Sequence, residues 1–232
     1  YSFTIVWGEE RSTDDAEGEV TVTSPVRPTE AAIRAILEKF TGEIEQIPPQ
    51  FSAIKVDGQR AYDLAREGEE VELASRIVYI ETLELVEAGP DSARFRCLCG
   101  KGTYMRSLAR DMARELGTAG YITGLRRESV GPFNLENAIS LAKLEEIGHS
   151  AVLPVETVLG DIPALALNER EAAQLKSGQC LNFIARPDMD RLHRAGLNLE
   201  HEATALAVYN GKPIALVSVD GVEIRPHRVL NL

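Results

Sequence analysis

The sequence predicts an α+β fold, in which a mixed and mainly antiparallel sheet flanked by helices precedes a small β-rich, barrel-like domain. Three observations lead to this prediction. The chain of 232 residues exceeds the common size of a single domain. Residues 1–158 combine half-buried strand patterns with amphipathic helix patterns. After a boundary near the prolines 154 and 163, residues 159–232 contain one helix and several short strands.

Two strands and a helix open the chain. Residues 1–7 alternate in the manner of a half-buried strand, and residues 19–23 predict a second strand after a polar loop. Thr29 is a suitable N-cap for the following helix, and Gly42 fits just past its end. The apolar stripe of this helix consists of Ile33, Ile36, Leu37 and Phe40.

A loop, a short helix and a strand pair come next. Pro48 and Pro49 cannot continue a helix or occupy a central strand, so the surrounding residues form a loop. A short helix is expected over residues 60–66. Two strands, over residues 77–87 and 93–99, are expected around a turn that contains Gly89 and Pro90.

The helix that follows Thr103 has two distinct faces. Arg106, Arg110 and Arg114 recur every four residues and form a basic stripe. Its apolar face consists of Met105, Leu108, Ala109, Met112 and Leu116. A loop then leads to residues 125–128, and a further helix near Ser140 carries Leu141, Leu144 and Ile147.

The tail shows clear local signals. Asn168 and Glu171 suit a capping box at the start of a helix, and Gly178 suits its end. Asn210-Gly211 between two apolar runs is a strong signal for a β-hairpin. Residues 222–232 predict a closing strand.

Composition limits the kind of protein. The net charge of −11 disfavours a nucleic-acid partner by itself, but bases outnumber acids from Lys101 to Glu128, so a local basic surface for RNA remains possible. Three cysteines without framework spacing argue against a disulfide scaffold, and Cys97 and Cys99 are interpreted as small core residues in a reducing cytoplasm.

No membrane span or signal peptide is expected. Because the chain starts without Met inside a strand, we expect a fragment or a processed piece.

Residues 101–106 are the first candidate site. A basic residue in the first turn of a helix opposes the positive helix terminus, so Arg106 calls for an anionic partner. Its guanidinium suits a carboxylate or a phosphate, and Tyr104 offers an aromatic face and a hydroxyl. The alternative is a surface arginine beside a packed tyrosine.

Two further segments combine bases with aromatic or apolar side chains. Residues 48–66 carry Lys55, Arg60, Arg66, Phe51 and Tyr62, a pattern that suits RNA because bases stack and phosphates pair. A mobile surface loop with a few buried anchors is the alternative. Arg126 and Arg127 follow Leu125, and two solvated arginines explain this spacing equally well. The four histidines show no metal-ligand spacing, and no motif implies a cofactor.

Several ordered segments resemble the TruB family of bacterial tRNA pseudouridine synthases. Residues 42–58 and 61–68 resemble the RNA-gripping thumb of that family, which corresponds here to about residues 43–74. Residues 99–111 resemble the segment that carries its active-site Tyr and Arg. Tyr1 with residues 11–18 is similar to its active-site Tyr strand and the loop behind it, and Leu125 with its two arginines matches a later segment. The tail, 159–232, is similar to the RNA-binding PUA-type domain of these enzymes.

The resemblance implies isomerisation of uridine 55 in the T-loop of tRNA, without cofactor or metal, by a cytoplasmic monomer. Tyr1 would stack on the flipped base, Arg106 would orient the catalytic carboxylate, and Tyr104 and Leu125 would shape the pocket. RNA contacts are expected from the thumb and the basic surface. They comprise Lys55, Arg60, Tyr62, Arg66, Lys101, Arg110, Arg126 and Arg127.

One departure from the family pattern is decisive for activity. The catalytic aspartate of the family lies in a Gly-rich segment with Leu-Asp-Pro, upstream of the Tyr1 strand, and this sequence contains no Asp-Pro pair. We therefore expect an N-terminally incomplete catalytic domain and no activity from the chain alone. Two alternatives remain: a non-catalytic RNA-binding or tRNA-folding module on the same scaffold, and a β-rich adaptor without an RNA role.

Overall fold

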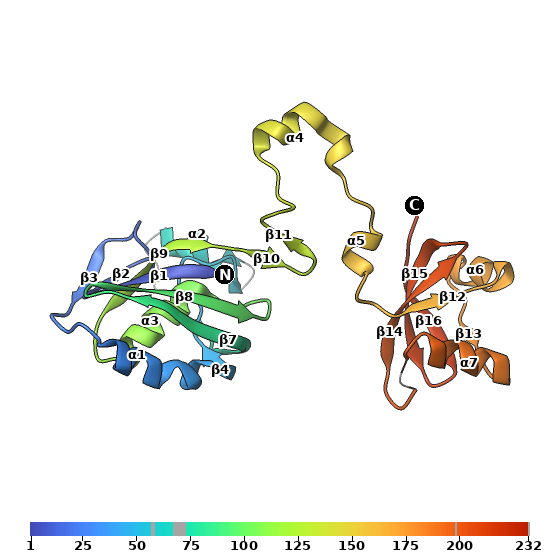
Figure 1. Cartoon of the computed structure of the whole chain (residues 1–232), viewed down its shortest axis with the longest axis horizontal. Coiled ribbons are helices and arrows are strands. Elements are labelled where there is room, and N and C mark those ends of the chain that lie inside the picture. The colour runs from blue at the N-terminus through green and yellow to red at the C-terminus, as the bar shows by residue number, and fades with distance from the viewer. Residues whose placement is uncertain (57–58, 67–72, 198, 232) are drawn as a thin grey trace. The chain divides into compact units, whose positions relative to one another are not determined.

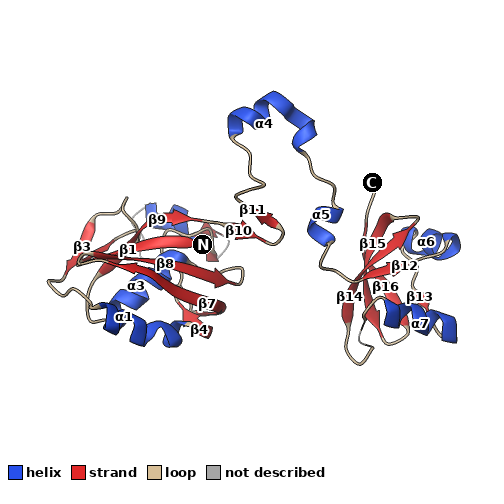
Figure 2. Cartoon of the chain, in the orientation of Figure 1, coloured by secondary structure: helices blue, strands red, loops and turns tan. Residues whose placement is uncertain are grey.

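The computed structural model describes residues 1–56, 59–66, 73–197 and 199–231 and divides the chain into two compact units. Unit 1 is Tyr1–Val130 and unit 2 is Gly131–Leu232 (Figure 1). Each unit contains strands and helices and has its own apolar core, so the α+β prediction holds for both (Figure 2). Among the described residues, no helix is long and apolar enough to cross a membrane.

Unit 1 is built on a five-stranded antiparallel sheet. Its strands, in spatial order, are β4 (Gly42–Gln46), β7 (Arg76–Ala88), β8 (Ser92–Cys99), β1 (Ser2–Trp7) and β9 (Gly120–Arg126). The alternation predicted for β1 is real, because Phe3, Ile5 and Trp7 are buried while their neighbours are half-buried. In the β1–β8 register Phe3 lies opposite Phe95, and their stacked rings are 5.5 Å apart.

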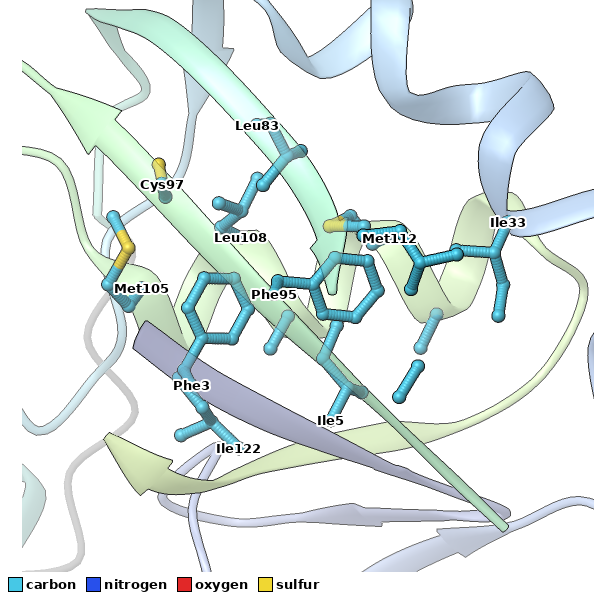
Figure 3. Close-up of a cluster of buried hydrophobic side chains, with 14 of the residues drawn as sticks. Phe3, Ile5, Ile33, Leu83, Phe95, Cys97, Met105, Leu108, Met112 and Ile122 are labelled. Atoms are coloured by element: carbon cyan, nitrogen blue, oxygen red, sulfur yellow. The ribbon is translucent and has the colours of Figure 1, made fainter. Parts of the chain in front are cut away.

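Helices supply the rest of the unit 1 core. Helix α1 (Glu30–Ile36) continues into the 3₁₀ helix η1 (Leu37–Phe40), and the Thr29 hydroxyl caps α1 as predicted. Helix α3 (Met105–Glu115) buries the predicted apolar face against the same strands. Figure 3 shows Leu108 and Met112 of α3 among side chains of the sheet, with Ile33 of α1 beside them. The basic stripe of α3 is therefore held in a fixed orientation.

Short elements complete unit 1. The pair β2 (Glu9–Arg11) and β3 (Val20–Thr23) forms a hairpin, and β5 (Lys55–Val56) pairs with β6 (Gln59–Arg60) before α2 (Ala61–Arg66). Strand β10 (Ser129–Val130) ends the unit.

Unit 2 begins with β11 (Phe133–Asn134), α4 (Leu141–Ile147), the 3₁₀ helix η2 (Gly148–Ala151) and α5 (Glu156–Leu159). Its five-stranded sheet has the order β12 (Ala164–Ala166), β14 (Ala203–Tyr209), β15 (Lys212–Asp220), β16 (Glu223–Val229) and β13 (Leu181–Asn182). Helices α6 (Glu169–Lys176) and α7 (Arg186–Arg194) contribute buried side chains to the same apolar core as this sheet. The capping box at Asn168 and the hairpin turn at Asn210-Gly211 are confirmed.

Three expectations need correction. Residues 120–126, predicted as part of a loop, form β9, because pairing with β1 overrides the two glycines in this segment. Helix α7 was not predicted, although Pro187 lies in its first turn as helix starts prefer. The apolar stripe of α4 is not buried, since Leu141 is 79% exposed. The division of the chain at residues 158 and 159 stays a prediction.

Candidate active site

The candidate site lies at the end of the sheet where α3 begins. Strand β8 ends at Cys99, Gly102 adopts a positive φ of +88°, and α3 starts at Met105. Because β1 is antiparallel to β8, Tyr1 lies at this same end, where Cys97 N donates to Tyr1 O at 2.8 Å. The fold therefore brings the predicted catalytic residue Tyr1 near the segment that carries Tyr104 and Arg106.

Tyr104 is the N-cap of α3, yet its own side chain forms no capping hydrogen bond. The buried Gln46, at the end of β4, bonds the backbone of Tyr104 instead. Tyr104 N donates to Gln46 Oε1 at 2.8 Å, and Gln46 Nε2 donates to Tyr104 O at 3.2 Å. Sequence reasoning did not single out Gln46.

Arg106 is held by three acceptors. Its Nη1 donates to Thr13 O at 3.0 Å and to Asp15 Oδ2 at 3.2 Å, and its Nη2 donates to Phe51 O at 2.7 Å. The expected need for an anion is met by Asp15, while the partner that the resemblance implies is the catalytic aspartate of the family. The Arg106 side chain keeps 22% of its surface exposed, so it is not fully enclosed by these acceptors.

The other two arginines of the stripe also pair with acids of the segment Glu10–Asp15. Arg110 donates from Nη1 to Asp14, from Nε to Asp111 and from Nη2 to Ile47 O, each at 2.9 Å. Arg114 pairs with Glu10. The acids follow the arginines in reverse order, because the segment runs along α3 in the opposite direction.

These pairs bear on the predicted role of Arg110, which stays a prediction. We expected Arg110 to contact RNA from a basic surface, but it is 9% exposed and all of its guanidinium nitrogens donate within the fold. A guanidinium that is buried and bonded on all three nitrogens is poorly accessible to a phosphate. Its role is to hold the Asp14 turn and the loop at Ile47 against α3.

Asp14 is an unusual residue in this set. It is a buried non-glycine residue with a φ of +59°, and its O accepts from Ile122 N at 3.1 Å. Burial raises the pKa of Asp14 from 3.8 to about 6, although the Arg110 guanidinium opposes this shift.

The pKa of Asp14 predicts how stability depends on pH. A carboxyl whose pKa is raised by folding binds its proton more tightly in the folded state, so its contribution to stability falls as pH rises from about 4 to about 6. Asp14→Asn removes this titration and tolerates the positive φ. Relative to Asp14→Asn, the wild type is expected to lose about 2 kcal/mol of unfolding free energy between pH 4 and pH 7. Urea titrations at both pH values, followed by Trp7 fluorescence, measure it. A difference that is independent of pH would contradict the prediction.

A cavity of about 1070 Å³ lies beside these ion pairs in unit 1. Its walls come from α3, the β2–β3 hairpin, the chain around β4 and residues 73–75. Several charged groups in the walls pair with one another, as Asp14 and Asp111 do with Arg110 and Glu10 does with Arg114. In the described ranges, no group of three or more His, Cys, Asp or Glu side chains could hold a metal ion.

The remaining predicted pocket residue, Leu125, is 48% exposed on β9. The register places Ser2 opposite both Arg96 and Arg126, so the end of β9 lies next to the start of β1. Tyr1 and Leu125 are thus at the same end of the sheet. Their roles stay predictions.

The predicted thumb exposes aromatic and basic groups together. The Phe51 and Tyr62 rings meet edge to face at 6.1 Å, and the Arg66 guanidinium lies 4.5 Å from the centre of the Tyr62 ring. Lys55 is exposed on β5. The side chain of Arg60 and residues 57–58 and 67–72 of this region lie outside the described part of the chain.

Three further predicted RNA contacts are exposed. They are Lys101, in the turn before α3, and Arg126 and Arg127, at and after the end of β9. Their side chains form no ion pair with any residue that the structure describes. These three cations are therefore available to an anionic ligand, unlike Arg110.

The two strand cysteines are only partly core residues. Cys97 is buried as predicted, whereas Cys99 is half-buried. A hydrogen bond from Cys97 lowers the pKa of Cys99 to about 6, and burial opposes this shift.

Comparison with known proteins defines first the fold and then the family. The chain is similar in fold to a chain of a Cbf5-Nop10-Gar1 complex, with a TM-score of 0.63 at 18% identity over 98% of this chain and 66% of that one. It is also similar in fold to a chain of an H/ACA RNP bound to a substrate RNA containing 2′-deoxyuridine. That comparison has a TM-score of 0.62 at 17% identity and covers 100% of this chain and 66% of the other chain.

Family models and curated relatives are more specific. The model for the TruB family pseudouridylate synthase N-terminal domain matches residues 1–105, and that for the tRNA pseudouridylate synthase B C-terminal domain matches residues 106–160. The tRNA pseudouridine synthase B of Rhodospirillum rubrum is 48% identical over 238 residues, 100% of this chain and 76% of the relative. That of Bradyrhizobium diazoefficiens is 50% identical, over 100% of this chain and 68% of the relative. The chain belongs to the TruB pseudouridine synthase family.

Relatives in this family are longer than the chain. The chain spans 76% of the Rhodospirillum rubrum relative but 64% of that of Rhodopseudomonas palustris.

Proposed function

We propose that this chain forms the part of a tRNA pseudouridine synthase that binds the T-arm and orients the catalytic carboxylate for uridine 55. One observation carries the proposal: Arg106 is fixed at the start of α3 by Asp15 and two carbonyls, two residues after Tyr104, and its side chain is still 22% exposed. The names of the family relatives support the reaction and its tRNA substrate.

The reaction is an isomerisation, so the substrate gains and loses no atoms overall and no cofactor is needed. The C1′–N1 bond of the uridine breaks, the base turns over, a C1′–C5 bond forms, and the proton on C5 is released while N1 gains one. Tyr1 stacks on the base after it leaves its stack. Arg106 pairs with the catalytic carboxylate and keeps it ionised and oriented. Tyr104 and Leu125 line the space where the base turns.

RNA binding would come from surfaces away from the base. Lys101, Arg126 and Arg127 are free cations near the site, and the thumb residues Lys55, Arg60, Tyr62 and Arg66 would grip the arm. Residues 159–232 would act as a PUA-type RNA-binding domain. We infer a monomer that works in the cytoplasm, where its tRNA substrate is found.

The catalytic aspartate is not among these 232 residues, because no Leu-Asp-Pro segment occurs in them. Asp15 is not assigned this role, because it follows the Tyr1 strand in the chain, whereas the catalytic aspartate of the family pattern precedes that strand. We therefore infer that the chain binds tRNA but does not isomerise it until such a segment is supplied.

Release of tritium from tRNA labelled at C5 of uridine tests this proposal, because isomerisation frees the C5 proton. The chain alone is expected to release none, whereas a chimera that carries the Leu-Asp-Pro segment of the Rhodospirillum rubrum relative before Tyr1 should release one equivalent per tRNA. A tRNA transcript with C55 in place of U55 is the matched control. Release by the chain alone would contradict the inferred inactivity. A folded chimera that binds tRNA without release would instead support the RNA-binding module.

A further inference from the structure

We propose that Gln46 is a positioning residue of the active site, which fixes the backbone of Tyr104 and thereby the direction of the Tyr104 and Arg106 side chains. This inference rests on the proposed function and adds to it a residue that touches no reacting atom. Gln46 is the last residue of β4, and 58 positions separate it from Tyr104.

The contact between Gln46 and Tyr104 is a paired one. Gln46 Oε1 accepts from Tyr104 N at 2.8 Å, and Gln46 Nε2 donates to Tyr104 O at 3.2 Å. The side-chain amide thus bonds both backbone groups of one residue, as a neighbouring strand would. Gln46 is 2% exposed, so water does not compete for these bonds.

Helix α3 depends on this contact because its start is otherwise weakly capped. Tyr104 is its N-cap without a side-chain cap, and Tyr104 O also accepts the first helical bond, from Leu108 N at 3.0 Å. Fixing both backbone groups of Tyr104 fixes the direction in which its side chain leaves the helix. Arg106 follows two residues later, so its reach towards Asp15 and Phe51 depends on the same anchor.

Gln46 also connects two parts of the site. Ile47 O, directly after it, accepts from Arg110, and Phe51 O, five positions after Gln46, accepts from Arg106. The first part of the predicted thumb, from Gln46 to Phe51, is therefore bonded to the start of α3 at three points, and Gln46 makes the bonds to Tyr104. A loss of Gln46 should loosen the geometry of catalysis more than the capture of RNA, since the exposed RNA-binding cations lie elsewhere.

The test uses the chimera described above and compares three variants. Gln46→Met keeps the volume but removes both hydrogen bonds, and Gln46→Glu keeps the acceptor but replaces the donor with a buried charge. Glu38→Met is the control, because Glu38 is exposed on η1, outside the predicted thumb, and its side chain forms no hydrogen bond or ion pair with a described residue. For each variant, kcat, KM and tRNA affinity are measured at a temperature well below the midpoint of unfolding.

Both Gln46 variants are expected to lower kcat by about 10- to 100-fold with a change in KM of less than about 3-fold. Glu38→Met should stay within about 2-fold of the wild type. In a Tyr104→Phe background the effect of Gln46→Met should shrink, because the two residues act as a unit. Reduced stability with unchanged kcat would overturn the proposal, as would equal losses of affinity and rate. If the chimera with the wild-type sequence is inactive, both the role of Gln46 and the proposed function fail. If that chimera is active but the Gln46 variants keep its kcat, only the role of Gln46 fails.

Discussion

Replacing Arg106 with alanine in the chimera is expected to lower kcat by about 10²- to 10³-fold, while the affinity for tRNA changes by less than about 3-fold. The guanidinium is held by Asp15 and by the carbonyls of Thr13 and Phe51, so its position is set before substrate binds. Such preorganised charge acts on the reaction more than on the binding of a large RNA. Single-turnover kinetics and a filter-binding titration measure the two quantities separately.

Two companion variants sharpen this result. Arg106→Lys keeps the charge but cannot reach three acceptors in fork geometry, so it should recover only a small part of the rate. Arg114→Ala, two turns further along α3, removes an exposed pair with Glu10 and should leave kcat within about 3-fold. Equal losses of affinity and rate in Arg106→Ala would show that this residue binds RNA rather than orients a carboxylate.

Arg106 also shows how far sequence reasoning reaches. A base in the first turn of a helix is unfavourable, and this local rule correctly required an anionic partner. The strand alternation of β1 and the N-cap at Thr29 are local in the same way and were confirmed. Patterns that involve only near neighbours in the chain could be predicted.

Contacts between distant segments could not be predicted in this way. Asp15 lies 91 positions from Arg106, and Gln46 lies 58 positions from Tyr104. One signal was present: Glu10 and Asp14 are four residues apart, as are Arg110 and Arg114. That spacing predicts the two ion pairs only once the Glu10–Asp15 segment is known to run along α3. The positive φ of Asp14 likewise depends on tertiary contacts rather than on local preference.

Replacing Arg110 with methionine is expected to destabilise unit 1 by about 3–5 kcal/mol. The variant leaves Asp14 without its buried ion-pair partner and removes bonds to Asp111 and Ile47. Urea unfolding followed by fluorescence isolates this effect, because Trp7 is the one tryptophan of the chain and is buried in the core of unit 1. Unfolding of unit 2 therefore does not contribute to the signal.

A double variant separates the cost of the unpaired charge from the worth of the pair. In Arg110→Met with Asp14→Asn, the buried carboxylate is gone and the remaining amide is neutral, so about half of the lost stability or more should return. The ion pair would then serve mainly to fix the turn that carries Asp15, rather than to raise the stability of the fold. A loss below about 1 kcal/mol in the single variant would contradict the buried network. A loss that the second substitution does not relieve would assign the cost to the bonds with Asp111 and Ile47 instead.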